Sequence, residues 1–391
     1  MKILQVFNRY LEKGGEEIWV EEFEKLAEQD HEVSTLYFES DTWREGSLFE
    51  RFRQARLMWN NPSSRHTLSK TVSEGHTEAL VFHNVLPVGS FGLYQEAAKL
   101  NLPVFQYTHN FRPFSPSGTL WVNGKVEADA MDGKMWKEVS AGAWGNSRLK
   151  TALAAFYFKK FIKSGLIDQV THWLAISDFM RDQFIAAGLP EEKVTTLRHC
   201  RKVERDPGES SDHGYYLFLG RLVPEKGCLM LVETWKNLER KLGGNCPKLV
   251  IAGTGPCEEE MKNLVGGSDK VRMAGFVSGK EKEALLRECR ALLAPSIWWE
   301  PLGLIAYDGY EYGKPVLAAR SGGLAEVVSQ AGGGFLHEPG NVNDLGQKIE
   351  DIEEMSDEQR REIGKSGFEW LSSEAGPERW REKLTEILTR C

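Results

Sequence analysis

The chain has 391 residues, of which 41% are hydrophobic and 27% charged, a composition typical of a globular protein with two domains of ordinary size. Its net charge of −8 argues against nucleic-acid binding through a broad basic surface. No apolar run approaches the roughly 18 residues of a membrane span. Six scattered cysteines, with no Cys-X-X-Cys pair, are typical of free thiols in a reducing compartment, so we expect a cytoplasmic protein.

The first half of the chain alternates strand-like and helix-like patterns, which predicts a parallel sheet with helices on both faces. The predicted strands are Lys2–Phe7, Glu32–Phe38, Ala79–Phe82, Pro103–Tyr107, Trp173–Ile176 and Val194–Leu197. A loop with Gly14 and Gly15 follows the first strand, and His83 and His109 follow two others. Ligands of open α/β sheets gather outside the carboxyl ends of the strands, so these positions are candidates for a site. The alternatives are an ordinary turn for the glycines and a structural role for each histidine.

A basic, aromatic helix is predicted at Ser147–Ser164, and it has no acidic residue. One interpretation is contact with an anionic membrane surface or an anionic acceptor. The other is an ordinary packed helix with a solvated basic edge. The stretch before it, Phe114–Asn146, is long and irregular, and a loop of that length in a compact domain usually has a function or covers another part of the domain.

The charged segment 201–214, with its Pro-Gly and Ser-Ser pairs, is the best candidate for a linker between domains. We expect a first domain over residues 1–205, a second over residues 206–374, and a C-terminal helix over residues 375–391. The second half then repeats the α/β pattern. Its predicted strands are Tyr215–Leu219, Lys248–Ala252, Val271–Phe276, Ala291–Ala294 and Val316–Ala319.

The stretch Pro295–Pro315 follows the fourth of these strands and is predicted to form a turn and then a helix. If the helix begins near Gly303, the amides of Gly303 and Leu304 have no intrahelical acceptor and can bind an anion or a hydroxyl group. Glu300 stands beside them, and Asp308 lies about one and a half turns into the helix. This combination suits a ligand that carries both hydroxyl groups and phosphate. The alternative is a capped helix with two solvated carboxylates.

Two cations follow the first strand of the second half, Arg221 directly and Lys226 five residues later. An arginine offers a bidentate fork to phosphate oxygens and a lysine a point charge. A departing pyrophosphate group needs such neutralisation as its bond to a sugar breaks. The chain has no Asp-X-Asp motif and no His/Cys cluster with metal-ligand spacing, so we expect side chains rather than a metal ion to hold the diphosphate.

Taken together, these motifs resemble those of the retaining glycosyltransferases of the glycogen-synthase-like family 4. The matching segments, which span most of the chain, are Gly14–Glu17, Asp30–Val33, His83, His109, Gly220–Leu222 with Lys226–Gly227, Gly275–Val277, Glu300–Val316 and Gly322–Glu326. The resemblance implies an α/β protein of GT-B architecture: two Rossmann-like domains that face each other across a cleft, with the C-terminal helix packing back across the domain junction.

The resemblance also implies roles for single residues. Arg221 and Lys226 would bind the donor diphosphate, Glu300 the hydroxyl groups of the donor sugar, and Asp308 the ribose, with His109 near the sugar. The residues implied to bind the donor are Gly15, Arg221, Lys226, Gly275, Phe276, Val277, Glu300, Gly303, Leu304 and Asp308. Those implied to act at the reacting centre are His109, Arg221, Lys226 and Glu300.

The chain departs from the family pattern at two places. Asp308 stands where the family has a glutamate, and it is one methylene shorter. The segment Leu197–Arg201 stands where the family usually has Asn-Gly-Val-Asp. The first departure affects the reach toward a ribose, and the second affects local contacts before the linker.

We therefore expect a hexosyl transfer from a nucleotide-diphosphate sugar to an acceptor hydroxyl group, with retention of anomeric configuration, in glycan or glycoconjugate biosynthesis. No cofactor or metal ion is expected. The acceptor would be a saccharide, a lipid-linked molecule or a small molecule, and peripheral contact with the inner face of a membrane is kept open. The alternatives are a GT-B isomerase of the epimerase type and a non-catalytic binder of nucleotide sugars.

Overall fold

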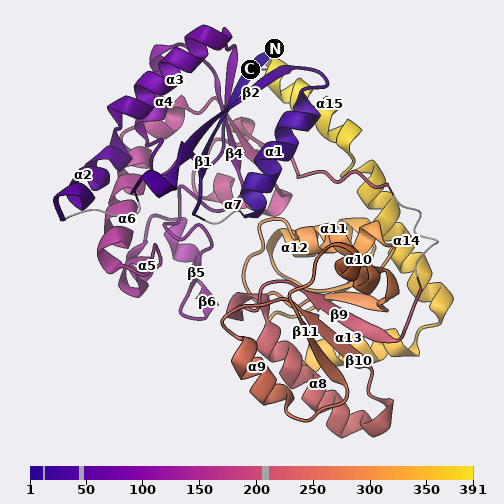
Figure 1. Cartoon of the computed structure of the whole chain (residues 1–391). Coiled ribbons are helices and arrows are strands. Elements are labelled where there is room, and N and C mark those ends of the chain that lie inside the picture. Colours follow the sequence, from indigo (N-terminus) through magenta and orange to yellow (C-terminus); the bar gives the residue numbers. More distant parts are fainter. Residues whose placement is uncertain (12–13, 44–47, 205–210, 391) are drawn as a thin grey trace. The chain divides into compact units, whose positions relative to one another are not determined.

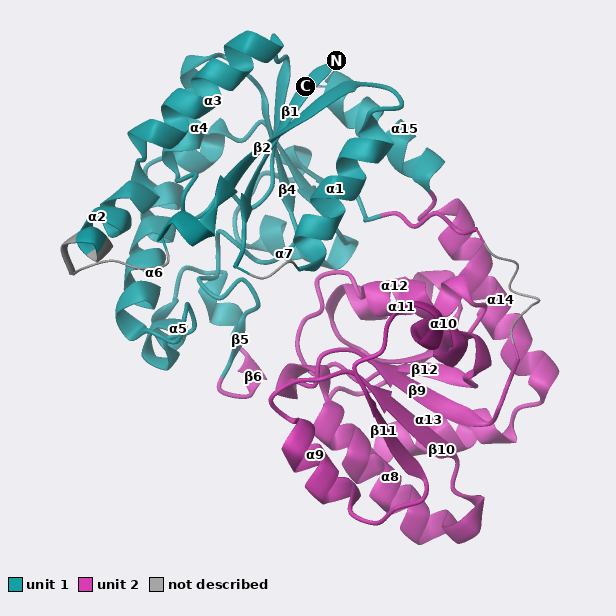
Figure 2. Ribbon diagram, viewed as in Figure 1, with its two compact units in different colours: residues 1–122, 127–199, 377–391 teal, residues 123–126, 200–376 magenta. Residues whose placement is uncertain are grey.

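The computed structural model describes residues 1–11, 14–43, 48–204 and 211–390, which form two compact units (Figure 1). The first unit contains residues 1–122, 127–199 and 377–391, and the second contains residues 123–126 and 200–376 (Figure 2). The domain boundary that we expected between residues 205 and 206 lies outside the described residues.

The first unit is built on a parallel six-stranded sheet in the order β2-β1-β3-β4-β7-β8. Its strands are β1 (Lys2–Arg9), β2 (Glu32–Glu39), β3 (Ala79–Phe82), β4 (Val104–Thr108), β7 (His172–Ala175) and β8 (Val194–Thr196). All six strands predicted for this half are confirmed, with ends that differ by one or two residues. The chain moves from β1 to β2 on one side and then to β3 on the other, so the strand order reverses between β1 and β3.

Helices lie on either side of this sheet (Figure 1). They are α1 (Gly15–Ala27), α2 (Leu48–Trp59), α3 (Pro62–Gly75), α4 (Gly92–Lys99), α5 (Trp136–Ala141), α6 (Arg148–Lys163) and α7 (Asp178–Ala186), with the short strands β5 (Trp121–Val122) and β6 (Lys125–Val126). The predicted basic helix is confirmed as α6, and Ser147 caps it by accepting from the amide of Lys150. Helices α2 and α3 lie in a region for which we made no prediction from the sequence.

The second unit repeats the design with the sheet order β11-β10-β9-β12-β13-β14, again parallel throughout. Its strands are β9 (Tyr215–Leu219), β10 (Lys248–Ala252), β11 (Val271–Gly275), β12 (Ala291–Ala294), β13 (Val316–Ala319) and β14 (Gly334–His337). The edge strand β14 was not predicted. Here the strand order reverses between β9 and β12.

The helices of the second unit are α8 (Cys228–Leu242), α9 (Glu258–Val265), α10 (Gly279–Glu288), α11 (Leu304–Glu311), α12 (Gly322–Ala331), α13 (Val342–Glu354) and α14 (Asp357–Ser373). Helix α8 buries the apolar stripe expected from its spacing, Leu231, Trp235 and Leu238, in the core of the unit. The indole of Trp235 also donates a 2.9 Å hydrogen bond to the carbonyl of Pro247, so its burial leaves no polar atom unsatisfied.

The last helix, α15 (Pro377–Arg390), returns to the first unit, as the resemblance implied for the C-terminal helix. Trp380 is 3% exposed and meets Trp19 and Phe23 of α1 edge to face. At the rim, Arg381 donates a 2.7 Å hydrogen bond to the carboxylate of Asp30. Among the described residues, no helix is long and apolar enough to cross a membrane.

Candidate active site

The predicted donor-binding residues of the second unit follow strands at the point where its strand order reverses. Arg221 follows β9, and Glu300 follows the neighbouring strand β12. Because both strands are parallel, their carboxyl ends meet at one edge of the sheet, where open α/β folds bind ligands. Arg221 is exposed, and no described residue forms a hydrogen bond or ion pair with its guanidinium group.

Glu300 is a buried carboxylate that forms an ion pair with Lys226. Its Oε1 also accepts a 2.8 Å hydrogen bond from the hydroxyl of Ser296. Burial by itself would raise the pKa of Glu300, but Lys226 and Ser296 outweigh it and hold the pKa below its usual range. The carboxylate is therefore ionised at neutral pH, and a cation and an anion stand together at the sheet edge.

Two glycines allow the loops around this ion pair to approach each other. Gly227 has φ +70°, and a Cβ there would lie 2.0 Å from the carbonyl oxygen of Pro295. Gly322 has φ +59°, and a Cβ there would lie 2.4 Å from the carbonyl oxygen of Glu300. The amide of Gly323 donates a 2.7 Å hydrogen bond to that same oxygen. Only glycine fits both positions, so the two turns fix the backbone that carries Glu300.

Helix α11 begins at Leu304, with Gly303 in the left-handed region at its N-cap. Its first amides have no intrahelical acceptor, as the sequence predicted. Asp308 is held elsewhere: its Oδ1 accepts from Arg201 at 3.2 Å and its Oδ2 from Lys282 at 3.3 Å. Sequence reasoning missed both cations, because nothing in the local pattern of either segment points to a partner on α11.

The segment Gly275–Val277, which the resemblance implies to bind the donor, begins at the last residue of the edge strand β11. Gly275 accepts a 2.7 Å hydrogen bond from the amide of Gly253, which ties the segment to the loop after β10. Phe276 is 74% exposed and Val277 is buried. An exposed aromatic ring beside a buried aliphatic residue offers a flat apolar surface at this end of the sheet.

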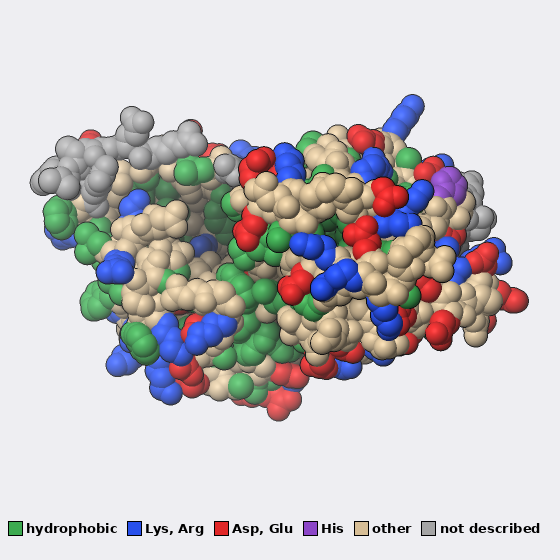
Figure 3. Space-filling view, turned by 90° about the horizontal axis from the view of Figure 1, so that it is seen from below, with side chains coloured by type: hydrophobic (Ala, Val, Ile, Leu, Met, Phe, Trp, Pro, Cys, Tyr) green, Lys and Arg blue, Asp and Glu red, His purple; other side chains and the backbone are tan. Residues whose placement is uncertain are grey.

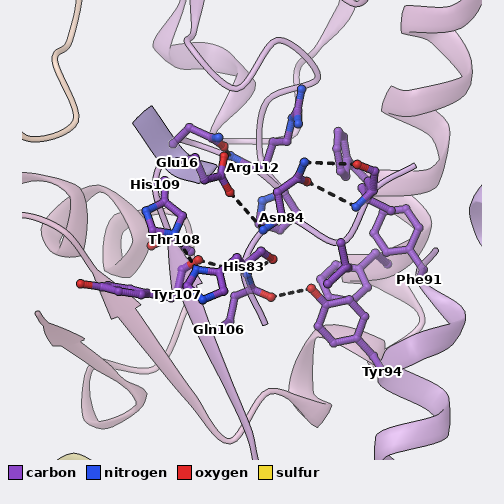
Figure 4. A pocket seen from close by; sticks show the side chains of 16 residues that line it. Glu16, His83, Asn84, Phe91, Tyr94, Gln106, Tyr107, Thr108, His109 and Arg112 are labelled. Carbon is purple, nitrogen blue, oxygen red and sulfur yellow. Dashed lines mark hydrogen bonds between the residues drawn. The ribbon is translucent and has the colours of Figure 1, made fainter. Parts of the chain in front are cut away.

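In the first unit, a pocket lies at the reversal between β1 and β3, and Figure 4 shows the side chains that line it. Glu16, in the first turn of α1, accepts a 2.7 Å hydrogen bond from the hydroxyl of Tyr10 and a 3.1 Å bond from the amide of Asn84. Arg112 also lines the pocket, a cation that no sequence motif indicated. Gly15 starts α1, and a Cβ on it would meet no described atom within 4 Å.

Both ring nitrogens of His109 bind other histidines. The Nε2 atom lies 2.8 Å from Nδ1 of His83, and Nδ1 lies 3.0 Å from Nε2 of His199. Burial lowers the pKa of His109 and, more strongly, those of His83 and His199, whose pKa values the charge of a protonated His109 lowers further. His199 lies in the segment that departs from the family pattern, and sequence reasoning did not foresee this contact.

Comparison with known proteins matches residues 201–370 to the family described as glycosyl transferases group 1. An uncharacterised glycosyltransferase of Methanocaldococcus jannaschii is 31% identical over 184 residues, which cover 45% of this chain and 50% of that protein. A GDP-mannose-dependent alpha-(1-6)-phosphatidylinositol monomannoside mannosyltransferase of Mycobacterium tuberculosis is 29% identical over 181 residues, 44% of this chain and 46% of that protein. The chain thus spans about half the length of the curated relatives it matches.

Solved structures match the whole chain in fold. Anabaena HepE in complex with UDP is 16% identical with a TM-score of 0.68, and it covers 100% of both chains. The lipopolysaccharide outer core galactosyltransferase WaaB is 14% identical with a TM-score of 0.68, again over 100% of both chains. These likenesses confirm the fold class, two Rossmann-like units of the GT-B type. Residues 201–370, which carry the predicted donor motifs, belong to the glycosyl transferases group 1 family.

Proposed function

We propose that the protein is a retaining glycosyltransferase that moves a hexosyl group from a nucleotide-diphosphate sugar to an acceptor hydroxyl group. The observation that carries the proposal is the set of Arg221, Lys226 and Glu300 at the reversal of the second sheet. The set lies within the segment that matches glycosyl transferases group 1. It combines cations for a diphosphate with a carboxylate for sugar hydroxyl groups.

The leaving diphosphate gains negative charge as its bond to the anomeric carbon breaks. Arg221 is free to take phosphate oxygens through its fork, and Lys226 adds a second positive charge. Lys226 is already oriented by Glu300, so little reorganisation is needed when the donor arrives. The first amides of α11, at Gly303 and Leu304, would add hydrogen bonds to phosphate or sugar oxygens.

The ribose and the base would be bound by other parts of the same unit. Asp308 would accept from ribose hydroxyl groups with its carboxylate already held by Arg201 and Lys282. Phe276 and Val277 would face the base. The solved structure of HepE contains UDP, and the mycobacterial relative is named for GDP-mannose. UDP-sugars and GDP-sugars are therefore the first donors to be tested.

The acceptor would bind in the pocket of the first unit. Its lining combines a carboxylate, Glu16, with the amide of Asn84 and the guanidinium group of Arg112, a set that suits a hydroxylated acceptor. Gly15 would add backbone that a ligand can approach closely, because a Cβ there would meet no described atom within 4 Å. His109 lies at the same sheet edge, with its ring nitrogens bound to His83 and His199.

A panel of UDP-, GDP- and ADP-sugars tests the proposal. We expect one donor to release its nucleoside diphosphate when an acceptor is present, and the new glycosidic bond, followed by proton NMR, to keep the anomeric configuration of the donor. Interconversion of sugar epimers without glycosyl transfer would instead indicate the isomerase. A rise in melting temperature with a donor, but no turnover with any acceptor, would indicate a binder.

We also propose that the first unit contacts anionic membranes through α6. Three of its aromatic residues, Tyr157, Phe158 and Phe161, are buried against the unit, which confirms the packed-helix interpretation for them. Leu149 and Phe156 are 78% and 59% exposed on the same helix. The exposed cations of α6 are Arg148, Lys150, Lys159, Lys160 and Lys163. In Figure 3, hydrophobic (green) and basic (blue) side chains lie next to each other on the face of the molecule that is seen from below.

Vesicle flotation tests this contact. We expect wild type to float with vesicles that contain anionic lipid, less so at high salt, and not with neutral vesicles. The variant Lys159→Glu/Lys163→Glu should lose this binding. Lys236→Glu/Arg240→Glu on α8 changes the net charge equally and should keep it. Equal binding by both variants, or none by wild type, would remove the membrane contact.

A further inference from the structure

Three histidines that end three different strands form a continuous chain inside the first unit. His83 follows β3, His109 follows β4, and His199 follows β8. The rings of His83 and His109 stack at 5.1 Å, with Nδ1 of His83 2.8 Å from Nε2 of His109 (Figure 4). The contact His109–His199 measures 3.0 Å. Beyond His83 the chain continues to Gln5 on β1, whose Oε1 lies 3.1 Å from Nε2 of His83.

Gln5 fixes the direction of every hydrogen bond in this chain. Its Nε2 donates to the carbonyl of Val20 at 3.1 Å and to the hydroxyl of Thr35 at 2.7 Å. A backbone carbonyl can only accept, and the Thr35 hydroxyl already donates to Glu24 at 2.7 Å. The amide oxygen of Gln5 must therefore face His83, and it can only accept from Nε2 of that ring.

The tautomers follow one from another. A neutral His83 with its proton on Nε2 has a lone pair on Nδ1, so Nε2 of His109 must donate to it. A neutral His109 then has its lone pair on Nδ1, and Nε2 of His199 must donate there. The order ends at Nδ1 of His199, a buried atom for which the described part of the chain provides no hydrogen-bond partner. His199 is 5% exposed and stacks on Trp19 at 4.0 Å.

We propose that Gln5 and His199 are positioning residues for the transfer reaction. Gln5 sets the direction of the hydrogen bonds, so that His109 carries its proton on Nε2 and its lone pair on Nδ1. His199 donates a hydrogen bond to that lone pair and so orients the ring of His109. This inference rests on the proposed function for its catalytic meaning. The ordered tautomers make His109 a hydrogen-bond acceptor on the Nδ1 side only.

The neutral state that this order needs is supported by the surroundings. Burial keeps the pKa values of all three histidines low, although the charge of Glu16 opposes this effect at His109. Glu16 is itself bound by Tyr10 and Asn84 rather than by an imidazole. An extra proton can enter the chain without breaking a bond only at Nδ1 of His199, because every other lone pair already accepts.

The tautomers can be measured directly in the protein without any donor. In ¹⁵N-labelled wild type at about pH 7.5, the ring nitrogens of His83, His109 and His199 should all show a protonated Nε2 and an unprotonated Nδ1. A protonated Nδ1 on His109, or shifts averaged between the two tautomers, would overturn the inference. This readout is independent of turnover, so it decides the order of the chain even if the proposed function fails.

Two matched variants then separate the effect of hydrogen-bond direction in the histidine chain from the effect of losing a buried glutamine side chain. Gln5→Met removes the acceptor of His83, and the shifts of His109 should become averaged. Gln106→Met removes a buried glutamine on β4 that binds the backbone of His83 but no imidazole, and the shifts should stay as in wild type. Unchanged His109 shifts in folded Gln5→Met, or averaged shifts in Gln106→Met, would contradict the role given to Gln5.

The role of His199 is tested by activity once a donor is known. His199→Gln keeps an N–H at the position of Nε2, whereas His199→Leu removes it. We expect His199→Leu to lower kcat by about tenfold with a smaller change in KM, the equivalent of one lost hydrogen bond, and His199→Gln to retain most of kcat. Equal kcat in the two variants would overturn the positioning role. If His199→Leu does not fold, His199→Gln alone decides: a kcat about tenfold below that of wild type would also overturn the role.

Discussion

At the scale of single residues, the Lys226–Glu300 ion pair decides the chemistry of the second unit. The Glu300 side chain is 7% exposed and that of Lys226 is 24% exposed, so the charges interact in a medium much less polar than water. Removing either partner leaves a charge that water reaches poorly. Removing both, with Lys226→Met and Glu300→Gln, removes the interaction and its desolvation cost together.

We therefore expect a coupling free energy of about 1–3 kcal/mol between Lys226→Met and Glu300→Gln in a double-mutant cycle of urea unfolding. The more exposed pair Lys262–Glu258 on α9 is the control, for which a clearly smaller coupling is expected. Equal coupling in the two cycles would show that the burial of Glu300 contributes nothing to the pair.

Stability should also depend on pH in a window set by the buried histidines. Those with a pKa lowered by burial are His31, His83, His109, His172, His199 and His337. The unfolded chain binds protons below about pH 6.5 that the folded chain excludes, so folding is favoured above that pH. As pH drops toward the folded-state pKa values, the free energy of unfolding should fall by up to about 1.4 kcal/mol per pH unit for each of the most deeply buried histidines, His83, His109 and His199, and by less for those that water partly reaches.

Urea unfolding at about pH 7.5, 6.5 and 5.5 measures this trend. Carboxylates with a lowered pKa, such as Glu300, lose their contribution only below about pH 4.5 and do not act in this range. A free energy of unfolding that stays level or rises between about pH 6.5 and 5.5 would contradict the neutral, buried state of the histidines.

At the scale of elements, α14 sets the position of α11 through glycines. A Cβ on Gly367 would lie 2.3 Å from Cδ1 of Tyr310, and one on Gly364 would lie 1.9 Å from the carbonyl oxygen of Gly313. Tyr310 belongs to α11 and is fully buried. The close packing of these two helices therefore holds the helix whose N-terminus carries Gly303.

The substitution Gly367→Ala should destabilise the protein by about 1–3 kcal/mol, because the added methyl group overlaps Tyr310 and outweighs the better helix propensity of alanine. Gly267→Ala is the control, since a Cβ there meets no described atom within 4 Å. Thermal unfolding compares them, and a Gly367→Ala variant as stable as Gly267→Ala would contradict the packing argument.

Caps show how far local patterns predict elements. Ser356 and Gln359 form a reciprocal capping box at the start of α14. Ser278 and Glu281 have the same spacing before α10, but the Ser278 side chain makes no cap hydrogen bond, although Ser278 occupies the N-cap. A pattern fixes where a helix begins, because backbone sterics decide that locally. Whether the cap bond forms depends on side-chain rotamers that the pattern does not contain.

At the scale of the whole molecule, alternation of strands and helices predicted both parallel sheets, because each βαβ step is local in sequence. The edge strand β14 and helices α2 and α3 were not predicted, since their patterns are weak and tertiary packing decides them. Among candidate site residues, Arg221, Glu300 and Asp308 were identified from motifs. The partners Arg201, Lys282 and His199 were not, because they meet the site from distant parts of the chain.

The most direct test of the proposed transfer is the kcat/KM for nucleotide release from the active donor, compared among wild type, Arg221→Ala and Arg240→Ala. Arg240 lies on α8, and its hydrogen bonds to described residues stay within that helix, so it controls for loss of a surface cation. We predict that Arg221→Ala lowers kcat/KM by about 10²-fold or more, the effect of removing a group that stabilises the leaving diphosphate, while Arg240→Ala matches wild type. Equal kcat/KM for Arg221→Ala and wild type would contradict the account.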